Sequence, residues 1–433
     1  MERSQLQPVR GMNDILAEDM PYWQFLERCA REVFDEYGYQ EVRVPLVEST
    51  ELFKRSIGEF TDIVEKEMYT FLDKGGDSLT LRPEATAGLV RAAISNGMLH
   101  NQKHRIWTSG PMFRHERPQK GRYRQFHQLD CEAFGYEGPD VDAEMILLSA
   151  RLWRRLGIAR VSLQINSLGT PESRRGYREL LVQHFEAHRN QLDQDSVRRL
   201  GGNPMRILDT KNPDMRPVVE SAPLMTDHLD AESRAHFDGL QAHLDACGIP
   251  FRINPRLVRG LDYYTRTVFE WTTDALGAQD AVCSGGRYDG LVAQLGGEPT
   301  PAIGWGLGQE RVTALLRESG VTVPGMVPDV YVVLAGDAAE RKGLALVEGW
   351  RDALPGLRIT SHLGGGSFKS QLRRADRSGA ALAVIVGDDE VARQRAALKT
   401  LRDERPQEQC GWAEVPARIS TLLLRQGLQP GEG

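Results

Sequence analysis

The chain has 433 residues, with 54 Lys or Arg against 60 Asp or Glu and a formal net charge of -6. This length is too great for one ordinary hydrophobic core and predicts two or three domains. The charge excludes a molecule-wide positive field, so any nucleic acid must be met by local basic patches. Five scattered cysteines, a polar start and no apolar run of membrane-spanning length predict a soluble, cytoplasmic protein with buried thiols.

The first predicted helix runs from Pro21 to Tyr37, where apolar residues recur at helical spacing and Pro21 suits a first turn. Gly38 ends this helix. The following EVRVPLV alternates like a strand, but Pro45 has no N–H to donate to a sheet ladder. Pro45 therefore belongs at a sheet edge or an interface. Farther on, LRPEATAG leads into a predicted helix over 87–94, for which Thr86 is a candidate cap.

Residues 113–132, FRHERPQKGRYRQFHQLDCE, combine arginines, aromatic rings and polar side chains around a turn that contains Pro118 and Gly121. The pattern predicts a hairpin with a longer loop. Side chains two apart share a face of a strand, so Arg114 and Glu116 would point one way from the first arm. One face of the second arm would carry Arg122, Arg124, Phe126, Gln128 and Glu132. Such a face suits a nucleotide. The alternative is a solvated surface with weak ion pairs.

Between Pro171 and Asn254 the sequence becomes charged and helix-like, whereas VSLQIN before it and TVFEW after it have the pattern of strands. We therefore predict a helical insertion into a sheet domain. A solvated helical outgrowth without a function is the alternative.

The later sequence AIGWGLGQERVTALL contains three glycines, Gly304, Gly306 and Gly308, that do not meet the spacing of a dinucleotide-binding fingerprint. Turns or close packing explain such glycines better. The next helix is predicted to begin near Gln309. Arg311 then lies in its first turn, where backbone amides and the helix dipole favour anions.

A second boundary is predicted in VTVPGMVPD, where Pro324, Gly325 and Pro328 interrupt both helical and strand periodicity. Strand-like and helix-like segments alternate after it, which predicts a small α/β structure with a largely parallel sheet. On the helix predicted for 368–378, Lys369, Arg373 and Arg377 form one basic stripe. Two interpretations of this stripe remain, a solvated helix face and an RNA contact surface.

Taken together, these motifs resemble the class II aminoacyl-tRNA synthetases in their histidyl, bacterial form, over nearly the whole chain. The resemblance implies an α+β fold with an antiparallel catalytic sheet flanked by helices, built from residues 1–170 and 255–323. It implies a helical insertion domain at 171–254 and a C-terminal α/β anticodon-binding domain at 328–433. The helix, strand and Pro45 near the start resemble the first class II motif, which implies a homodimer.

The activity that the resemblance implies is ligation of L-histidine to tRNA(His), with ATP as a substrate and Mg²⁺ as a cofactor. Arg114 and Arg259 would be the catalytic cations beside the α-phosphate. The residues implied for ATP binding are Arg114, Glu116, Arg122, Phe126 and Arg311, with Phe126 stacked on adenine. No protein-built metal site is expected, because His100 and His104 lack further ligands at recognisable spacing.

For histidine, the resemblance implies that Glu84, Thr86 and Gln128 hold the α-amino group and that Glu132 and Tyr264 meet the imidazole. Tyr263 and Tyr288 would line the same pocket. The basic stripe Lys369, Arg373 and Arg377 would contact tRNA. Two positions depart from the family pattern, since Ala85 and Asp130 stand where glycine is common.

Two other functions remain open from the sequence. A non-catalytic, synthetase-like subunit that serves histidine biosynthesis would share the resemblance, although such proteins typically lack the anticodon-binding domain and the catalytic arginines. A class II synthetase for threonine, proline or glycine would share the general motifs. The constellation of Tyr263, Tyr264 and Glu132 favours histidine over these.

Overall fold

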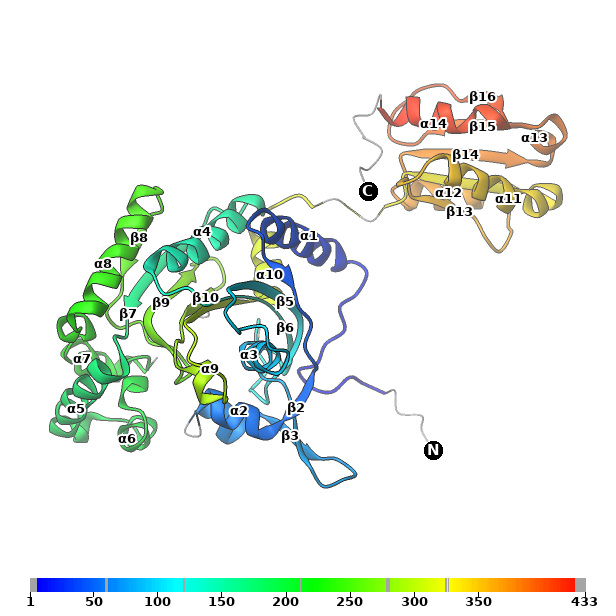
Figure 1. The fold of residues 1–433 in the computed structure, drawn as a ribbon. Coiled ribbons are helices and arrows are strands. Elements are labelled where there is room, and N and C mark those ends of the chain that lie inside the picture. The colour runs from blue at the N-terminus through cyan, green and yellow to red at the C-terminus, as the bar shows by residue number, and fades with distance from the viewer. Residues whose placement is uncertain are drawn as a thin grey trace. The chain divides into compact units, whose positions relative to one another are not determined.

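The computed structural model describes residues 6–58, 61–119, 121–210, 212–277, 281–323, 325 and 327–424. These fall into two units, Met1–Val323 and Pro324–Gly433 (Figure 1). Pro324, part of the predicted boundary, lies outside the described residues. The same holds for residues 1–5 and 425–433 at the ends of the predicted catalytic and anticodon-binding ranges.

An eight-stranded sheet in the order β1-β5-β6-β11-β10-β9-β7-β8 forms the centre of the first unit (Figure 1). Its strands are β1 Gln40–Glu41, β5 His104–Phe113, β6 Gln125–Phe134, β7 Ser162–Ser167, β8 Phe251–Ile253, β9 Thr265–Thr272, β10 Ala281–Arg287 and β11 Ala302–Gly308. Only the pairs β1–β5 and β7–β8 are parallel in this described sheet, so the predicted antiparallel character is confirmed.

Strands β5 and β6 form the predicted hairpin, but its arms are shorter and its loop longer than expected at the polar end. The last paired residues are Phe113 and Gln125. Arg114, Glu116, Arg122 and Arg124 therefore lie in the loop, not on strands, which corrects the predicted face. The loop contains Pro118, which cannot donate, and Gly121, whose φ is +74°. Phe126, Gln128 and Glu132 do share one face of β6 as predicted.

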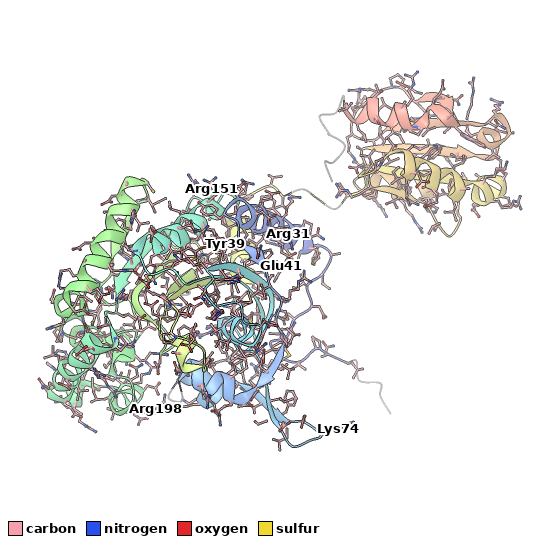
Figure 2. All side chains as sticks on the ribbon, viewed as in Figure 1. Arg31, Tyr39, Glu41, Lys74, Arg151 and Arg198 are labelled. Atoms are coloured by element: carbon pink, nitrogen blue, oxygen red, sulfur yellow. The ribbon has the colours of Figure 1, made fainter. Side chains whose placement is uncertain are left out.

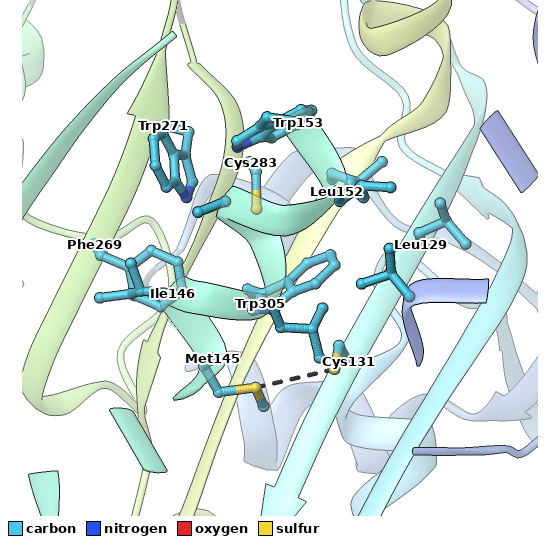
Figure 3. Close-up of a cluster of buried hydrophobic side chains, with 14 of the residues drawn as sticks. Leu129, Cys131, Met145, Ile146, Leu152, Trp153, Phe269, Trp271, Cys283 and Trp305 are labelled. Atoms are coloured by element: carbon cyan, nitrogen blue, oxygen red, sulfur yellow. Dashed lines mark hydrogen bonds between the residues drawn. The ribbon is translucent and has the colours of Figure 1, made fainter. Parts of the chain in front are cut away.

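One face of the sheet packs against helices α1 Met20–Glu36, α4 Pro139–Arg155 and α10 Gln309–Glu318. Alternate residues of β6, Leu129 and Cys131 among them, enter this core beside the α4 side chains (Figure 3). Cys131 Sγ lies 3.9 Å from Met145 Sδ, the contact drawn dashed in Figure 3. Because successive strand residues point to opposite faces, the other face is left for the site.

The predicted N-terminal helix is confirmed as α1, with Pro21 in its first turn and Gly38 following at φ +73°. EVRVPLV does not form one strand. It divides into β1 and β2 Val47–Ser49, which belong to different sheets, with Pro45 between them. The missing N–H of Pro45 explains the break. Both strands are edge strands, and Arg31 on α1 pairs with Glu41 at 2.8 Å beside Tyr39 (Figure 2).

A second, three-stranded sheet in the order β2-β4-β3 includes β3 Tyr69–Leu72 and β4 Ser78–Leu81. Lys74 lies at the tip of the β3–β4 hairpin, which projects from the unit (Figure 2). Helices near this sheet include α2 Thr50–Ile57, α3 Thr86–Ser95 and α9 Leu291–Gln294. The predicted helix over 87–94 is thus confirmed as α3.

The charged stretch after β7 is helical, as expected, with α5 Pro171–Ala187, α6 Gln194–Gly201, α7 Arg216–Glu220 and α8 Ala231–Ala246. Thr170, Asp193 and Asp230 cap three of these helices by accepting a backbone N–H at the third position. The expected range ended at Asn254, yet Phe251–Ile253 form β8 and pair with β7. The last residues of that range therefore belong to the large sheet.

The second unit carries a five-stranded sheet in the order β13-β12-β14-β15-β16. Its elements are β12 Val330–Ala335, α11 Asp337–Ala353, β13 Ile359–Ser361, α12 Phe368–Arg377, β14 Leu382–Gly387, α13 Asp388–Arg393, β15 Arg395–Thr400, β16 Glu408–Gly411 and α14 Val415–Leu424. β13, β12 and β14 are parallel, whereas β15 and β16 are antiparallel. The predicted largely parallel sheet is therefore only partly correct. The short α13 cannot supply the crossover that a further parallel strand needs.

Within the described part of the chain, no helix is both long and apolar enough to cross a membrane.

Candidate active site

The floor of the candidate site is formed by polar residues of β6 that face glycines of β11. Glu132 pairs with Gly304, Asp130 with Gly306 and Gln128 with Gly308. A Cβ at Gly304 would lie 1.5 Å from Glu132 Oε2, and one at Gly306 would lie 2.6 Å from Asp130 Oδ1. Gly304 and Gly306 therefore make room for carboxylates on the neighbouring strand. The glycine motif is a strand with small residues on one face, and the close-packing interpretation of the sequence was correct.

A pocket opens on this face and brings together residues that are far apart in the sequence. It is lined by Arg114, Arg259 and Arg311 and by nearly all the other residues predicted to bind ATP or histidine, namely Glu84, Thr86, Glu116, Arg122, Phe126, Gln128, Tyr263, Tyr264 and Tyr288. Glu132 is the exception, since it does not line the pocket. It lies behind Tyr288 and Thr86, which both donate hydrogen bonds to its carboxylate.

Arg259 is held from three sides. Its Nη1 donates to Glu270 Oε2 at 2.9 Å and its Nη2 donates to Ser284 Oγ at 2.8 Å. The guanidinium carbon lies 5.6 Å from the centre of the Tyr264 ring. The side chain of Arg259 is only 17% exposed. These contacts fix the planar fork in one orientation before any ligand arrives.

Arg114 is held by the backbone and by an aromatic ring. Its Nε donates to the Pro83 carbonyl at 2.8 Å, and its guanidinium carbon lies 5.2 Å from the centre of the Phe126 ring. A cation at this distance is attracted by the negative face of the ring. A base that stacks on Phe126 must then use the opposite face of the ring.

The two remaining arginines lie at the hairpin-loop end of the pocket. Arg122 pairs with Glu116, and the Arg122 side chain is 42% exposed. Arg311, in the first turn of α10, donates from Nε to Gly121 O at 3.3 Å and from Nη1 to Ala281 O at 2.6 Å. α10 begins at Gln309 as predicted. The helix therefore anchors a cation against the tip of the β5–β6 loop.

Glu84 caps helix α3. Its Oε2 accepts the Thr86 N–H at 2.8 Å and its Oε1 accepts the Ala87 N–H at 2.9 Å. Thr86 is not the cap, since its hydroxyl donates to Glu132 Oε1 at 2.7 Å. Ala85 has φ −97°, so the departure from glycine at this position causes no backbone strain.

Three tyrosines surround Glu132 and make this end of the pocket apolar apart from their hydroxyls. The rings of Tyr263 and Tyr264 lie 4.8 Å apart, and those of Tyr263 and Tyr288 lie 5.5 Å apart. Burial raises the pKa of Glu132 to about 8, although the hydrogen bonds from Tyr288 and Thr86 oppose the shift. Arg174 of α5 donates to the Tyr264 carbonyl at 2.5 Å, which ties the helical segment to this end of the pocket.

Asp130 is a pocket residue to which the sequence assigned no role beyond its departure from the family pattern. It is 4% exposed and lines the pocket between Gln128 and Glu132 on β6. Burial raises the pKa of Asp130 to about 8, and the nearby charge of Glu84 adds to the effect. Arg82 and Arg114 oppose it. The period-two pattern of β6 was the signal that could have placed Asp130 in the site.

Sequence reasoning also missed residues that position the predicted ones. Glu270 and Ser284 hold Arg259, and Glu310 accepts the His127 backbone N–H at 2.9 Å. His127 Nδ1 lies 3.0 Å from the same carboxylate, so this histidine orders the start of β6. Alternation along TVFEW placed Glu270 opposite to the core residues Phe269 and Trp271, but nothing in the sequence connected it to Arg259.

The basic stripe Lys369, Arg373 and Arg377 belongs to the second unit and lies on the exposed side of α12. The opposite side of α12 is fixed by Gln371, whose side chain bonds both Leu334 N and Leu334 O. Among the described residues, no cluster of three or more His, Cys, Asp or Glu has an arrangement that could hold a metal.

Comparisons with known proteins show the family of the chain. The family model described as histidyl-tRNA synthetase matches residues 11–312, and the model described as anticodon binding domain matches residues 329–422. The histidine–tRNA ligase of Hydrogenovibrio crunogenus is 56% identical over 419 residues, which cover 97% of this chain and 98% of the relative. That of Alkalilimnicola ehrlichii is 56% identical over 421 residues, covering 97% and 96%.

Among solved structures, apo histidyl-tRNA synthetase of S. aureus superimposes with a TM-score of 0.81 at 35% identity and covers 96% of this chain and 100% of that one. The class II synthetase fold expected from the sequence, with its large antiparallel-rich sheet and C-terminal anticodon-binding domain, is thereby confirmed. The chain belongs to the histidyl-tRNA synthetase family.

Proposed function

We propose that this chain is a histidine–tRNA ligase that activates L-histidine with ATP and transfers it to the 3′ end of tRNA(His). One observation carries the proposal. Arg114, Arg259 and Arg311 come from three separate segments and line a single pocket that also contains a cluster of tyrosines. A triphosphate requires several convergent cations, and a small polar amino acid requires a compact polar cavity next to them.

In the first step, a carboxylate oxygen of histidine attacks the α-phosphorus of ATP. The bond from that phosphorus to the β-phosphate oxygen breaks, and pyrophosphate leaves. Arg114 and Arg259 stabilise the charge that develops on the α-phosphate and the substrate carboxylate. Because both guanidiniums are already held in place, little reorganisation is needed when the charge develops.

The other nucleotide contacts follow from the positions of the remaining residues. Arg311 and Arg122, at the loop end of the pocket, meet the outer part of the nucleotide, and Glu116 orients Arg122 through their ion pair. Phe126 offers adenine the ring face that Arg114 leaves open. In the second step, a ribose hydroxyl of the terminal tRNA adenosine attacks the adenylate carbonyl and AMP leaves.

Histidine recognition is proposed to use two ends of one cavity. Glu84, Thr86 and Gln128 receive the α-amino group. Tyr264 and Glu132 receive the imidazole, with Tyr263 and Tyr288 as walls. Since Glu132 lies behind Tyr288, its influence on the imidazole passes through that hydroxyl unless Tyr288 moves. A site with buried polar partners rejects amino acids that leave those partners unmatched.

Mg²⁺ is proposed as the cofactor that arrives on the ATP phosphates. The fit rests on the donors of the pocket, which include the carboxylates of Glu116 and Glu310 but, within the described chain, no three-ligand cluster. Mg²⁺ usually binds through one or two carboxylates together with substrate phosphates, so a complete protein cage is not required. When bound, the ion neutralises charge on the phosphates.

Contacts with tRNA are proposed for two regions. Residues 171–254, as an insertion domain, would approach the acceptor arm, and there Arg198, Arg199 and Arg206 gather around Asp62 at 3.5, 3.5 and 3.7 Å. Residues 328–433, as the anticodon-binding domain, would use the stripe Lys369, Arg373 and Arg377. Local basic groups of this kind offset the negative net charge of the chain.

A homodimer in the cytoplasm is the proposed state of the protein. The two edge strands of the three-stranded sheet, β2 and β3, expose Val47, Phe71 and Leu72, and Leu46 next to β2 is 41% exposed. Exposed apolar residues along a sheet edge suit a subunit interface. Sedimentation at micromolar concentration should give twice the chain mass of 48.4 kDa. A monomer would contradict the proposal.

The deciding experiment is amino-acid-dependent exchange of pyrophosphate into ATP, measured with each amino acid separately. Histidine alone should support exchange, and the same protein should then charge tRNA(His). Exchange with threonine, proline or glycine in place of histidine would favour a different class II synthetase.

The alternative of a non-catalytic subunit for histidine biosynthesis is less supported. The chain matches the anticodon-binding model at 329–422 and carries Arg114, Arg259 and Arg311 in one pocket. A gel-shift assay without tRNA binding, combined with tight binding to a phosphoribosyltransferase, would favour that alternative.

A further inference from the structure

Asp130 occupies a central place on the floor of the pocket. It lies on the pocket face of β6, where its neighbours on the same face are Gln128 and Glu132. Across the neighbouring strands it faces Thr108 on β5 and Gly306 on β11. Because Gly306 has no side chain, β11 leaves room for the carboxylate, and Asp130 lines the pocket.

Two acceptor oxygens on this floor lack partners. Gln128 Oε1 and Asp130 Oδ2 are both buried and have no hydrogen bond from any described residue. Buried polar atoms in native proteins are nearly always paired, so two adjacent unpaired acceptors indicate a ligand donor that is missing from the free protein. Glu84 differs, since each of its oxygens already accepts a backbone N–H of α3.

We propose that Asp130 is a further substrate-binding residue, whose carboxylate, together with the Gln128 amide oxygen, receives the α-ammonium group of histidine. The inference rests on the proposed function and deepens it. An ammonium group has three donors and no acceptor, which matches a pair of bare acceptors next to Glu84. A carboxylate there also discriminates by charge against ligands without an amino group.

The spacing along β6 supports this assignment. Asp130 and Glu132 are two residues apart, which is about 7 Å along a strand. This separation is comparable to the reach of a histidine from its ring to its amino group. The imidazole can therefore lie at the tyrosine end, near Glu132, while the ammonium group reaches Asp130.

The surroundings of Asp130 contain charges of both signs. Glu84 and Glu132 repel its negative charge, and Arg82 and Arg114 attract it. Thr108 lies opposite Asp130 on the neighbouring β5, and the Cys283 thiol lies on β10, two strands away. Burial is the largest cause that raises the pKa of Asp130, to about 8. Asp130 is therefore partly ionised near neutral pH, and the ionised form is the one that offers two acceptor oxygens. An arriving ammonium group favours the ionised form, so histidine binding releases protons from the protonated fraction.

A direct test compares two ligands on two proteins by calorimetry. The ligands are L-histidine and imidazolepropionate, which is histidine without its amino group. Asp130→Asn keeps the shape of the side chain but removes its charge. We expect Asp130→Asn to weaken histidine binding by about tenfold or more, the usual value of a charge-assisted hydrogen bond. Imidazolepropionate binding should change by less than about twofold, since it has no ammonium group to lose a contact.

Thr108 provides the matched control. Its Oγ1 also lacks a hydrogen-bond partner in the described chain, and a rotation of this side chain is the rival explanation for the bare Asp130 oxygen. Thr108→Val removes that hydroxyl and should leave both affinities within about twofold of wild type. Equal losses for the two ligands in Asp130→Asn, or a Thr108→Val effect as large as that of Asp130→Asn, would overturn the proposal.

The pH dependence adds an independent readout. The ratio of the histidine Kd of Asp130→Asn to that of wild type cancels the titration of the free ligand. This ratio should rise between pH 6.5 and pH 8.5, because Asp130 in wild type becomes ionised over this range. A ratio that does not change with pH would contradict the role of the carboxylate.

The outcomes separate this inference from the proposed function. If wild type neither binds histidine nor supports exchange, both the proposed function and this inference are wrong. Exchange that is intact in wild type, with Asp130→Asn binding histidine at wild-type affinity, would remove the inference alone. Asp130→Gly, which opens the floor without adding a polar group, serves as a second variant if Asp130→Asn fails to fold. Like Asp130→Asn, it should weaken the binding of histidine more than the binding of imidazolepropionate.

Discussion

Two groups of cations in this chain are built in opposite ways. In the pocket, Arg259 is held by Glu270, by Ser284 and by the Tyr264 ring, and Arg114 is held by the Pro83 carbonyl. On α12, Lys369, Arg373 and Arg377 are exposed to solvent.

The difference in construction matches the difference between the tasks proposed for the two groups. A fixed guanidinium stabilises charge at the moment it develops on a reacting phosphate, because no reorganisation is needed. An exposed, mobile cation attracts a polyanion and adapts to its backbone, and its effect is weakened by salt. The number of arginines in a sequence therefore says little about their function until their contact partners are known.

The largest effect should follow from removing a fixed cation. Arg259→Ala should lower kcat for histidine-dependent exchange by about 10² to 10³, the usual loss for one preorganised charge-stabilising group. The histidine Kd should change by less than about threefold, since the charge develops late. Arg259→Lys should recover little, because lysine lacks the planar fork. Arg252→Ala, on the exposed residue of β8, is the control. Equal losses of affinity and kcat would contradict the role.

A buried arginine outside the pocket should show what fixed geometry contributes to stability. Arg287 and Asp142 are both fully buried, and Asp142 also lies 2.7 Å from His236 Nε2 on α8. Asp142→Asn should lower the free energy of unfolding by about 3 kcal/mol, since it removes the buried carboxylate and leaves Arg287 with Asp289 as its charged partner. Urea unfolding measures this value, and a loss below about 1 kcal/mol would refute it.

The same pair predicts a pH dependence. Burial raises the pKa of Asp142, but the hydrogen bond from His236 and the charge of Arg287 outweigh burial and hold the pKa below its usual value. A lowered folded-state pKa stabilises the protein above about pH 4, and this stability is lost as the pH falls through the folded pKa. Wild type should therefore lose its advantage over Asp142→Asn in acid. A stability difference that stays constant down to pH 3 would contradict the assignment.

A smaller effect is expected when the partner of a fixed cation loses only its charge. Glu270→Gln should lower kcat for exchange by about tenfold, because the amide still accepts from Arg259 but holds it less firmly. In the Arg259→Ala background, Glu270→Gln should have no further effect. A full tenfold loss in that background would mean that Glu270 acts independently of Arg259.

The smallest effect belongs to the exposed stripe. Arg373→Ala should weaken tRNA(His) binding a few-fold and reduce the slope of log K against log salt by about 0.7 to 1. Exchange without tRNA should not change. Arg393→Ala, on the exposed residue of α13, is the control in the same unit. Equal effects of the two substitutions would mean that the stripe has no special role.

Most elements of the fold were predictable because hydrophobic periodicity is a local property. Helices α1, α3, α10 and α12 and strands β7 and β9 lie within a few residues of their predicted positions. The failures share a cause. The ends of the β5–β6 arms, the division of EVRVPLV between two sheets and the antiparallel β15 and β16 depend on pairing partners. Pairing is a non-local property.

The candidate site divides in the same way. The residue types and the strand face on which each residue lies could be predicted from the sequence, so Phe126, Gln128 and Glu132 were placed on one face. The partners of Arg259, the capping of α3 by Glu84 and the position of Glu132 behind Tyr288 were not readable. The roles of these residues in binding ATP, histidine and tRNA stay predictions until the variants are measured.

The sequence by itself determined the membership of a family, the order of helices and strands and the chemical character of each motif, because these depend on residue identity and short-range spacing. Only the tertiary structure decided which charges meet. The need for glycine at 304 and 306 follows from Glu132 and Asp130, whose carboxylates lie beside them on the next strand. Asp130 Oδ2 has no hydrogen-bond donor among the described residues, because burial and strand pairing keep water and neighbouring donors away from it.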